Sequence, residues 1–259
     1  LLFWVATLTE HSTSYAFGSG VKRMLNGVAD LFYPRECGGC GCSMAEDDGA
    51  LCWDCLASCA PVTRPFCERC GDPIEGVSVD GFRCSLCRRR PPAFTLARSA
   101  FRYRGKLKHA MHGFKYSARL DLADNLAQML ESCVRAYDFD QNIDMILPVP
   151  LHATRFRERG YNQSSLLATH LSSRLGLHYR PAQILSRVRD TATQTGLNAR
   201  QRAVNVHGAF EVADSARVHG QSVLLVDDVM TTGATVSEAA RALQNAGAEA
   251  VFVVTVARG

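Results

Sequence analysis

The chain has 259 residues, a length that suits one large domain or a medium domain with a small one. Hydrophobic residues make up 47% of it and charged residues 21%, which is ordinary for a soluble globular protein. The net charge of +4 is too small to indicate a partner by its total, so the distribution of charge matters more.

The chain opens with the apolar stretch LLFWVATL, which covers only about eight positions, whereas a membrane-spanning helix needs about 20. No basic residue precedes this stretch, which argues against a secretory signal. We therefore expect residues 1–30 to be disordered or a miscalled start, with no membrane insertion. This favours a cytoplasmic protein, in which thiols stay reduced and paired cysteines bind metal more often than they form disulfides.

Ten of the 11 cysteines lie between Cys37 and Cys87, which predicts a separate small module over residues 31–92. They include four C-x-x-C pairs, and each pair can place two thiolates on one ion through a tight turn. Two such pairs complete a closed tetrahedral Zn2+ site, which is structural because it leaves no position for water. A redox or disulfide role is the alternative. The predicted ligands are Cys37, Cys40, Cys52, Cys55, Cys67, Cys70, Cys84 and Cys87.

The spacing leaves two features of these sites open. Sequential pairs or interleaved pairs can share an ion. Cys42 and Cys59 are spare thiols that can substitute as ligands. Because the segment has little else from which to form a core, metal binding is expected to supply its folding free energy.

Residues 88–119 contain ten Lys or Arg, five interleaved aromatic residues and no Asp or Glu. This composition is typical of grooves that bind single-stranded nucleic acid. The alternation in ARSAFRYRG also fits a strand with aromatic side chains on one face, so a solvated basic face is an equal alternative. The candidates for contact with single-stranded DNA are Arg102, Arg104, Lys106, Lys108 and Lys115.

Strands and helices alternate through the rest of the chain. Continuous aliphatic strands in such an order favour an α/β fold with a parallel sheet covered on both faces. Residues 189–206 show little periodicity. The expected strands cover residues 96–103, 143–151, 182–188, 206–212, 222–229 and 249–257, and the expected helices cover 105–116, 119–134, 162–176 and 233–247.

The stretch VLLVDDVMTTGATV, residues 223–236, combines a buried strand, two acids and a turn of small residues. Backbone N–H groups in such a turn can wrap a phosphate, helped by the dipole of the following helix. Asp227 and Asp228 would repel a phosphate, so they are better suited to sugar hydroxyls, bound directly or through Mg2+. The pattern predicts a ligand with a phosphate beside a vicinal diol, such as a ribose 5-phosphate. It is not a Walker loop, which needs a different spacing.

The chain resembles the type I phosphoribosyltransferases, and more narrowly the ComF/GntX family, over residues 31–259. The resemblance lies in VLLVDDVMTTGATV, the four C-x-x-C pairs, FRYRGKLKHAMHGFKY, PVPLHATRFRERGYNQS and RVRDTATQTGLNARQRAVNVHGAF. It implies a phosphoribosyltransferase-like parallel sheet with helices on both faces over residues 93–259, preceded by a zinc module. It also implies that the ligand is phosphoribosyl pyrophosphate (PRPP) with Mg2+.

The resemblance implies roles for individual residues. Asp227 and Asp228 bind the ribose hydroxyls, and with Arg189 and Arg202 they are the expected catalytic residues. The 5-phosphate turn is Thr231, Thr232, Gly233, Ala234 and Thr235. The pyrophosphate loop is Val149, Pro150, Leu151 and His152, with Arg155, Arg157 and Arg159 nearby. The mobile loop over PRPP is represented by Arg189, Thr191, Gln194, Leu197, Arg202 and Asn205.

Two functions from different classes follow. The first is an enzyme that transfers phosphoribosyl from PRPP to a nitrogenous acceptor with loss of pyrophosphate. The second is a non-catalytic PRPP-sensing module that binds single-stranded DNA during DNA uptake, with a helicase-like translocase as partner. The intact PRPP signature favours the first, and the ComF resemblance favours the second. Beyond the cysteine module, the sequence shows no separate segment to grip an acceptor base.

Overall fold

The structure is a computed structural model that describes residues 35–45, 49–76, 79–177, 184–192 and 196–259. The expectation for residues 1–30 and the position of Gln194 lie outside these ranges. None of the helices in the described ranges has the length and apolar character needed to span a bilayer.

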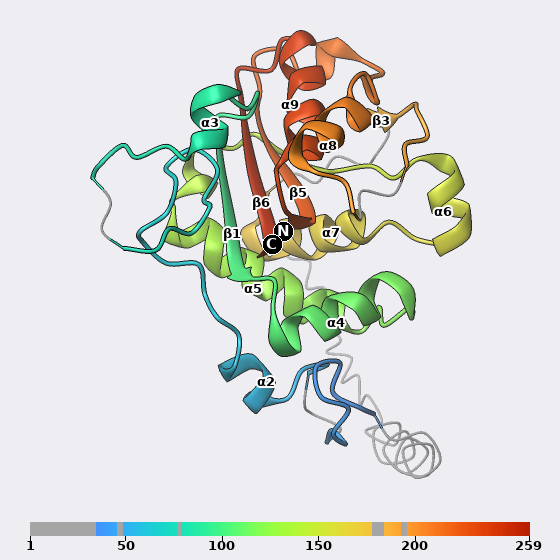
Figure 1. Cartoon of the computed structure of the whole chain (residues 1–259). Coiled ribbons are helices and arrows are strands. Elements are labelled where there is room, and N and C mark those ends of the chain that lie inside the picture. The colour runs from blue at the N-terminus through green and yellow to red at the C-terminus, as the bar shows by residue number, and fades with distance from the viewer. Residues whose placement is uncertain (1–34, 46–48, 77–78, 178–183, 193–195) are drawn as a thin grey trace, which may run out of the picture.

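A four-stranded parallel sheet forms the centre of the molecule, with strand order β1-β6-β5-β2 (Figure 1). In the register, Val226 of β5 lies opposite Val254 of β6 on one side and Pro148 of β2 on the other. All strands run the same way, so their carboxyl ends meet at one edge, where ligands of α/β proteins bind. The strands are β1 Leu96–Arg102, β2 Met145–Pro148, β5 Ser222–Met230 and β6 Ala250–Arg258.

Helices cover both faces of this sheet, as expected. Because side chains alternate along a strand, Leu224 and Val254 pack in the core formed with α4, α5 and α7. Leu225 and Val253 point the opposite way and pack in the core formed with α9. The helices are α4 Gly105–Tyr116, α5 Leu122–Ala136, α7 Gln163–Leu175 and α9 Ala234–Asn245.

Three features differ from the sequence expectation. Two of the expected strands form a separate antiparallel pair beside the main sheet, β3 Leu185–Arg187 with β4 Phe210–Val212. Two short helices appear, α6 Ala153–Arg159 and α8 Ala199–Val206. They escaped the periodicity argument because α6 buries no residue and α8 buries only Val206. The remaining short helices are α2 Trp53–Ala57, α3 Ser85–Arg89, η1 Phe139–Asn142 and η2 Ser215–Arg217.

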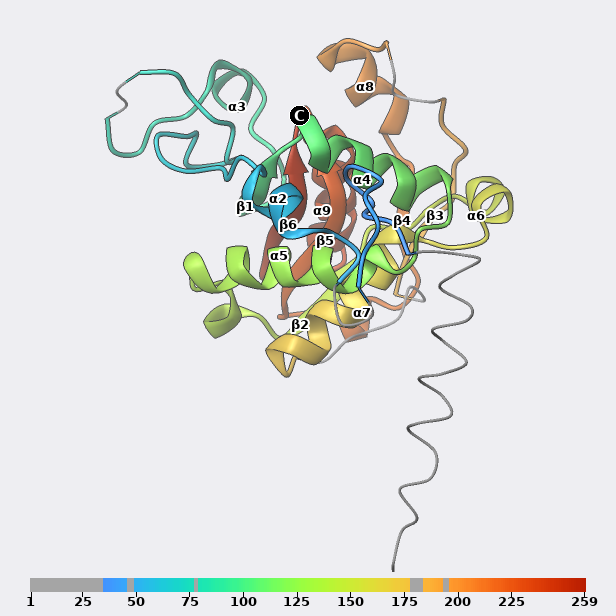
Figure 2. The same cartoon turned by 90° about the horizontal axis from the view of Figure 1, so that it is seen from below.

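The cysteine-rich segment lies along β1, the outer strand of the sheet (Figure 2). The backbone of Arg102 donates to the carbonyl of Ala60 at 2.8 Å, and that of Ala97 donates to the carbonyl of Arg69 at 2.9 Å. Cys37 and Cys55 join the core on the α4 and α5 face, whereas Cys67, Cys70 and Cys87 join the core on the α9 face. The segment therefore satisfies the open edge of the sheet and straddles it.

Candidate functional site

Two adjacent carboxylates mark the carboxyl end of β5. The Oδ1 atom of Asp227 accepts a hydrogen bond from the Ser164 hydroxyl at 2.9 Å. The Nζ atom of Lys115 lies 3.0 Å from Oδ1 of Asp228, and both side chains are largely buried. Ser164 is held by Asn162, which caps the start of α7 by accepting from the Ser164 N–H. Helices α4 and α7 thus each deliver one partner to the acid pair.

The surroundings of the acid pair alter its ionisation. Burial raises the pKa of Asp227 to about 7, and the neighbouring charge of Asp228 acts in the same direction. Burial alone would lower the pKa of Lys115, but the carboxylate of Asp228 overcomes this and raises that pKa above its usual value. Lys115 therefore stays charged, and Asp227 is the group whose charge changes near neutral pH.

The turn after β5 contains the small residues singled out by the sequence. Gly233 has a φ of +76°, a left-handed conformation that favours glycine, and it precedes the first residue of α9. A small hollow is lined by Asp227, by Thr231 and by residues 233–236 at the start of the helix. Asp227 and the N-terminus of α9 therefore share one hollow, and Asp228 is its neighbour in β5.

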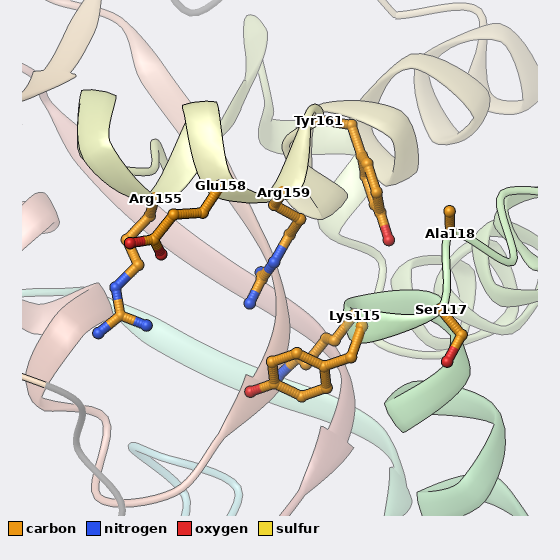
Figure 3. Close-up of a pocket in the computed structure, with 8 residues that line it drawn as sticks. Lys115, Ser117, Ala118, Arg155, Glu158, Arg159 and Tyr161 are labelled. Atoms are coloured by element: carbon orange, nitrogen blue, oxygen red, sulfur yellow. The ribbon is translucent and has the colours of Figure 1, made fainter.

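A basic cavity of about 220 Å³ lies beside the acid pair, toward β2. Its lining includes Lys115, Arg155, Arg159 and Arg187 together with Leu151 and His152. In a neighbouring pocket Figure 3 shows Arg159 extending from α6 toward Lys115 on α4. The Arg159 guanidinium also lies 5.1 Å from the centre of the Tyr116 ring. The site thus joins an acidic part to a cationic part.

The structure brings only some of the expected arginines to this place. Arg155 and Arg159 line the basic cavity, whereas Arg157 is exposed on α6 and does not line it. Arg202 donates to the hydroxyl of Thr231 at 2.5 Å, next to the turn. Arg189 donates to the backbone carbonyls of Asn205 and His207, so it lies against another residue of the expected mobile loop, and its catalytic role stays a prediction.

Lys115 also differs from its expected place. The sequence assigned it to a nucleic-acid face with Arg102, Arg104, Lys106 and Lys108, but its ammonium is paired with Asp228. Lys115 follows the buried Met111 by four residues, so it lies on the inward side of α4. This helical spacing was the sequence signal that could have predicted its inward position. Of the others, Arg104, Lys106 and Lys108 are exposed and Arg102 is half-buried.

Ser164 and Arg187 were not found by sequence reasoning. Ser164 reads as part of an ordinary helix start, and Arg187 lies in the short strand β3. Burial lowers the pKa of Arg187, while the charge of Asp227 acts in the opposite direction. Only the fold reveals that β3 ends beside the acid pair.

An arginine links the turn to the cysteine-rich segment. Arg258, at the end of β6, donates to the backbone carbonyls of Met230 and Thr231. The same guanidinium lies 2.8 Å from the carboxylate of Asp72, which follows Cys70 by two residues. The start of the turn is therefore tied to a cysteine loop.

The cysteines form two clusters. The sulfur atoms of each cluster all lie within 4.8 Å of one another, and the clusters are Cys37, Cys40, Cys42 and Cys52, and Cys67, Cys70, Cys84 and Cys87. Sequential pairs thus share each cluster. Cys42 takes the place expected for Cys55, because the left-handed turn at Gly41 brings it back toward Cys40. The Cys55 thiol remains close, since besides burial the thiols of Cys52, Cys40 and Cys37 help to raise its pKa.

Both clusters have the chemistry of thiolate metal sites. Burial alone would raise the pKa of Cys37, but backbone N–H groups of Cys52, Gly39 and Cys40 lower it to about 6. The Cys87 thiol is the main group that lowers the pKa of Cys70 to about 5. Thiolates are the ligands that structural zinc prefers.

Comparison with known proteins covers most of the chain. A phosphoribosyl transferase domain model matches residues 116–259, and a double zinc ribbon domain model matches residues 28–89. The DNA utilization protein YhgH of Salmonella typhimurium is 36% identical over 80% of this chain and 91% of its own. Competence protein F of Haemophilus influenzae is 30% identical over 88% of this chain and 98% of its own.

The chain belongs to the ComF family of phosphoribosyltransferase-like proteins. Competence protein ComFC of Bacillus subtilis is a more distant relative, 24% identical over 89% of this chain and 92% of its own. The family assignment agrees with the resemblance in the sequence, and the double zinc ribbon match together with the two cysteine clusters supports structural zinc.

We expect one zinc ion in each cluster and unequal sensitivity to substitution. Cys84→Ser should remove the second ion, because that cluster has four thiols and a tetrahedral site needs all of them. In the first cluster Cys42→Ser and Cys55→Ser should each retain zinc, since five thiols are close together, and the double variant should lose it. Metal analysis of purified protein measures this, with Cys59→Ser as the control. Loss of zinc from either single variant would contradict the five-thiol arrangement.

Proposed function

We propose that this ComF-family chain binds PRPP with Mg2+ and transfers its phosphoribosyl group to a nitrogenous acceptor with loss of pyrophosphate. The observation that carries the proposal is the hollow at the carboxyl end of β5, where Asp227, the first acid of the pair, meets the N-terminal turn of α9. A ribose 5-phosphate carries both a vicinal diol and a phosphate, the two groups that such a hollow would bind. The family assignment supports the same ligand.

In this proposal Asp227 and Asp228 accept hydrogen bonds from the ribose hydroxyls. The 5-phosphate occupies the turn of Thr231, Thr232, Gly233, Ala234 and Thr235, where backbone N–H groups and the helix dipole favour an anion. Carboxylate oxygens also suit Mg2+, a hard cation that is usually held by one or two carboxylates and by substrate phosphates. Bound there, Mg2+ would neutralise charge on the pyrophosphate.

The basic cavity is the proposed place of the pyrophosphate. Lys115, Arg155, Arg159 and Arg187 supply positive charge there, and Val149, Pro150, Leu151 and His152 form the loop beside it. Displacement of pyrophosphate from C1 of the sugar passes through an oxocarbenium-like centre. Negative charge then develops on the leaving group, and fixed cations stabilise it as it forms.

The segment from Arg189 to Asn205 is the proposed cover over PRPP. Arg202 already reaches the turn through Thr231, and Gln194 is proposed to contact PRPP. A closed cover would exclude water, so that PRPP reacts with the acceptor instead of being hydrolysed. The Arg189 guanidinium donates to the carbonyl of Asn205 near the end of α8. In this proposal that bond stabilises the segment that covers PRPP.

Substitutions in the aspartate pair and in the turn should affect PRPP binding differently. Asp228→Asn keeps the shape but removes a charge, so PRPP binding should weaken about ten- to a hundredfold in the presence of Mg2+ and much less without it. Gly233→Val places a β-branched residue at a φ of +76° and should abolish the turn with or without Mg2+. Calorimetric titration of PRPP into both variants measures this. Unchanged binding in both variants would place the PRPP site elsewhere.

The affinity for PRPP with Mg2+ should depend on pH through Asp227. The pKa of this carboxyl is raised to about 7, so below that pH it holds a proton that binding must release. Affinity should therefore be constant above about pH 8 and fall by up to about tenfold per unit between pH 7 and 6. Asp227→Asn should bind more weakly and keep only the shallower dependence that comes from the phosphates of PRPP, whose second ionisation lies at about pH 6. A wild-type profile that is flat between pH 6 and 8 contradicts the assigned role.

A second candidate function is the handling of single-stranded DNA, with PRPP as a sensed ligand. Its specific observation is the exposed basic side of α4 and the residue before it, formed by Arg104, Lys106 and Lys108. Two relatives carry names that refer to DNA utilization and to competence. In this candidate function a helicase-like translocase supplies the strand in the cytoplasm, a compartment in which thiols stay reduced and free to bind zinc.

Substitution of these three residues tests the DNA-binding candidate. Each phosphate contact releases a counterion, so affinity for an oligodeoxynucleotide falls with salt. Replacing Arg104, Lys106 and Lys108 by Gln should make the slope of log K against log salt shallower by about 2, at about 0.7 per contact. Fluorescence anisotropy over a salt series measures the slope. The control replaces the exposed Arg83, Arg157 and Arg217, and equal effects in both triple variants would mean that α4 is only a solvated face.

A further inference from the structure

A further cavity borders the turn of residues 231–235, which is the proposed 5-phosphate site. Its volume is about 380 Å³, within the range of small-molecule sites, and its walls come from α3 of the second zinc ribbon, α8 and α9. All three helices lie in the upper half of the molecule in the view of Figure 1. The cavity shares Thr232, Gly233 and Ala234 with the turn, but neither aspartate lines it.

The cavity carries an excess of positive charge. Four arginines line it, Arg89, Arg90, Arg200 and Arg241, against the one carboxylate of Glu238. That carboxylate is already occupied, because it contacts Arg241 at 3.3 Å and accepts from the Gly208 N–H at 2.8 Å.

Three of the arginines have side chains that the fold does not use. The guanidinium groups of Arg89, Arg90 and Arg200 are exposed and have no hydrogen-bond or ion-pair partner among the residues that the structure describes. Neighbouring guanidinium groups repel one another and create a positive potential in the hollow. Their planar forks suit phosphate oxygens, which they bind with charge-assisted hydrogen bonds.

The remaining walls are apolar. Leu86, Pro91 and Pro92 come from the ribbon and its connection to β1, and Ala203 and Val206 come from α8. Inorganic phosphate would contact only the arginines and leave the apolar walls exposed to water. A ligand with a flat, poorly hydrated ring and an attached phosphate would use both kinds of surface.

We propose that this cavity is a second ligand site, which binds a nucleotide unit with its base between the ribbon and α8 and its phosphate on Arg89, Arg90 and Arg200. The unit is a free mononucleotide or one nucleotide of a single strand, since both present the same chemistry. The site is separate from the proposed PRPP site. Its occupant touches the phosphate turn, so nucleotide and PRPP change each other's affinity by the same factor.

Calorimetry with AMP on the zinc-loaded full chain tests the proposal. We expect a saturable AMP site that persists in Asp228→Asn, and at least about tenfold weaker binding to it when Arg89, Arg90 and Arg200 are all replaced by Gln. Ala203→Trp, which fills the cavity without a change of charge, should weaken AMP equally. Arg88→Gln is the matched control, because Arg88 is an exposed arginine on the same helix that does not line the cavity. Circular dichroism and zinc content confirm that each variant is folded.

The outcomes separate this site from the PRPP site. The proposal is overturned if AMP does not bind measurably, or if it binds the triple variant as tightly as the wild-type chain. It is also overturned if Arg88→Gln loses AMP binding to the same extent, or if inorganic phosphate binds as tightly as AMP. Loss of AMP binding in Asp228→Asn would place AMP in the PRPP site and also overturn it. Loss in the triple variant supports it even if the wild-type chain fails to bind PRPP. Displacement of AMP by a short oligodeoxynucleotide, lost in the same variant, identifies the strand as the source.

Discussion

The candidate site depends on how the fold tolerates two adjacent carboxylates at the end of a buried strand. Like charges in a poorly hydrated place repel each other and favour protonation. The chain offsets this with Lys115 on Asp228 and Ser164 on Asp227, and these partners come from α4 and α7. The packing of both helices on one face of the sheet therefore does two things. It forms the core on that face, and it sets the charge of the site.

A second dependence joins the zinc ribbons to the rest of the molecule. Asp72 occupies the position in the second ribbon that Cys42 occupies in the first, two residues after a C-x-x-C pair. There it serves as an ion-pair partner of Arg258, whose guanidinium also holds the carbonyls of Met230 and Thr231. Arg98 adds a further link, since it donates to the Glu68 carbonyl and stacks on Phe66. The second ribbon is thus tied through Arg258 to the turn that follows β5.

Features that depend on neighbours in the chain were predicted well. The strand of Val223 to Val226, the acids after it and the glycine turn follow one another directly, so pattern and turn chemistry are sufficient. The helix over residues 105–116 was predicted with the bounds that the structure has. Its terminal Lys115 was assigned to the wrong surface, because a basic composition does not say which lysine turns inward.

By itself the sequence determined the α/β class, the cysteine pairs and the acid-and-turn motif at the end of β5, because hydrophobic period, ligand spacing and turn residues are local properties. Only the tertiary structure decided the strand order β1-β6-β5-β2 and the sharing of thiols between Cys42 and Cys55. It also decided that Lys115, Ser164 and Arg187 meet at the aspartates, with Ser164 and Asp227 63 positions apart. Such contacts arise when a parallel sheet brings the ends of distant strands to one edge, and no local pattern encodes that meeting.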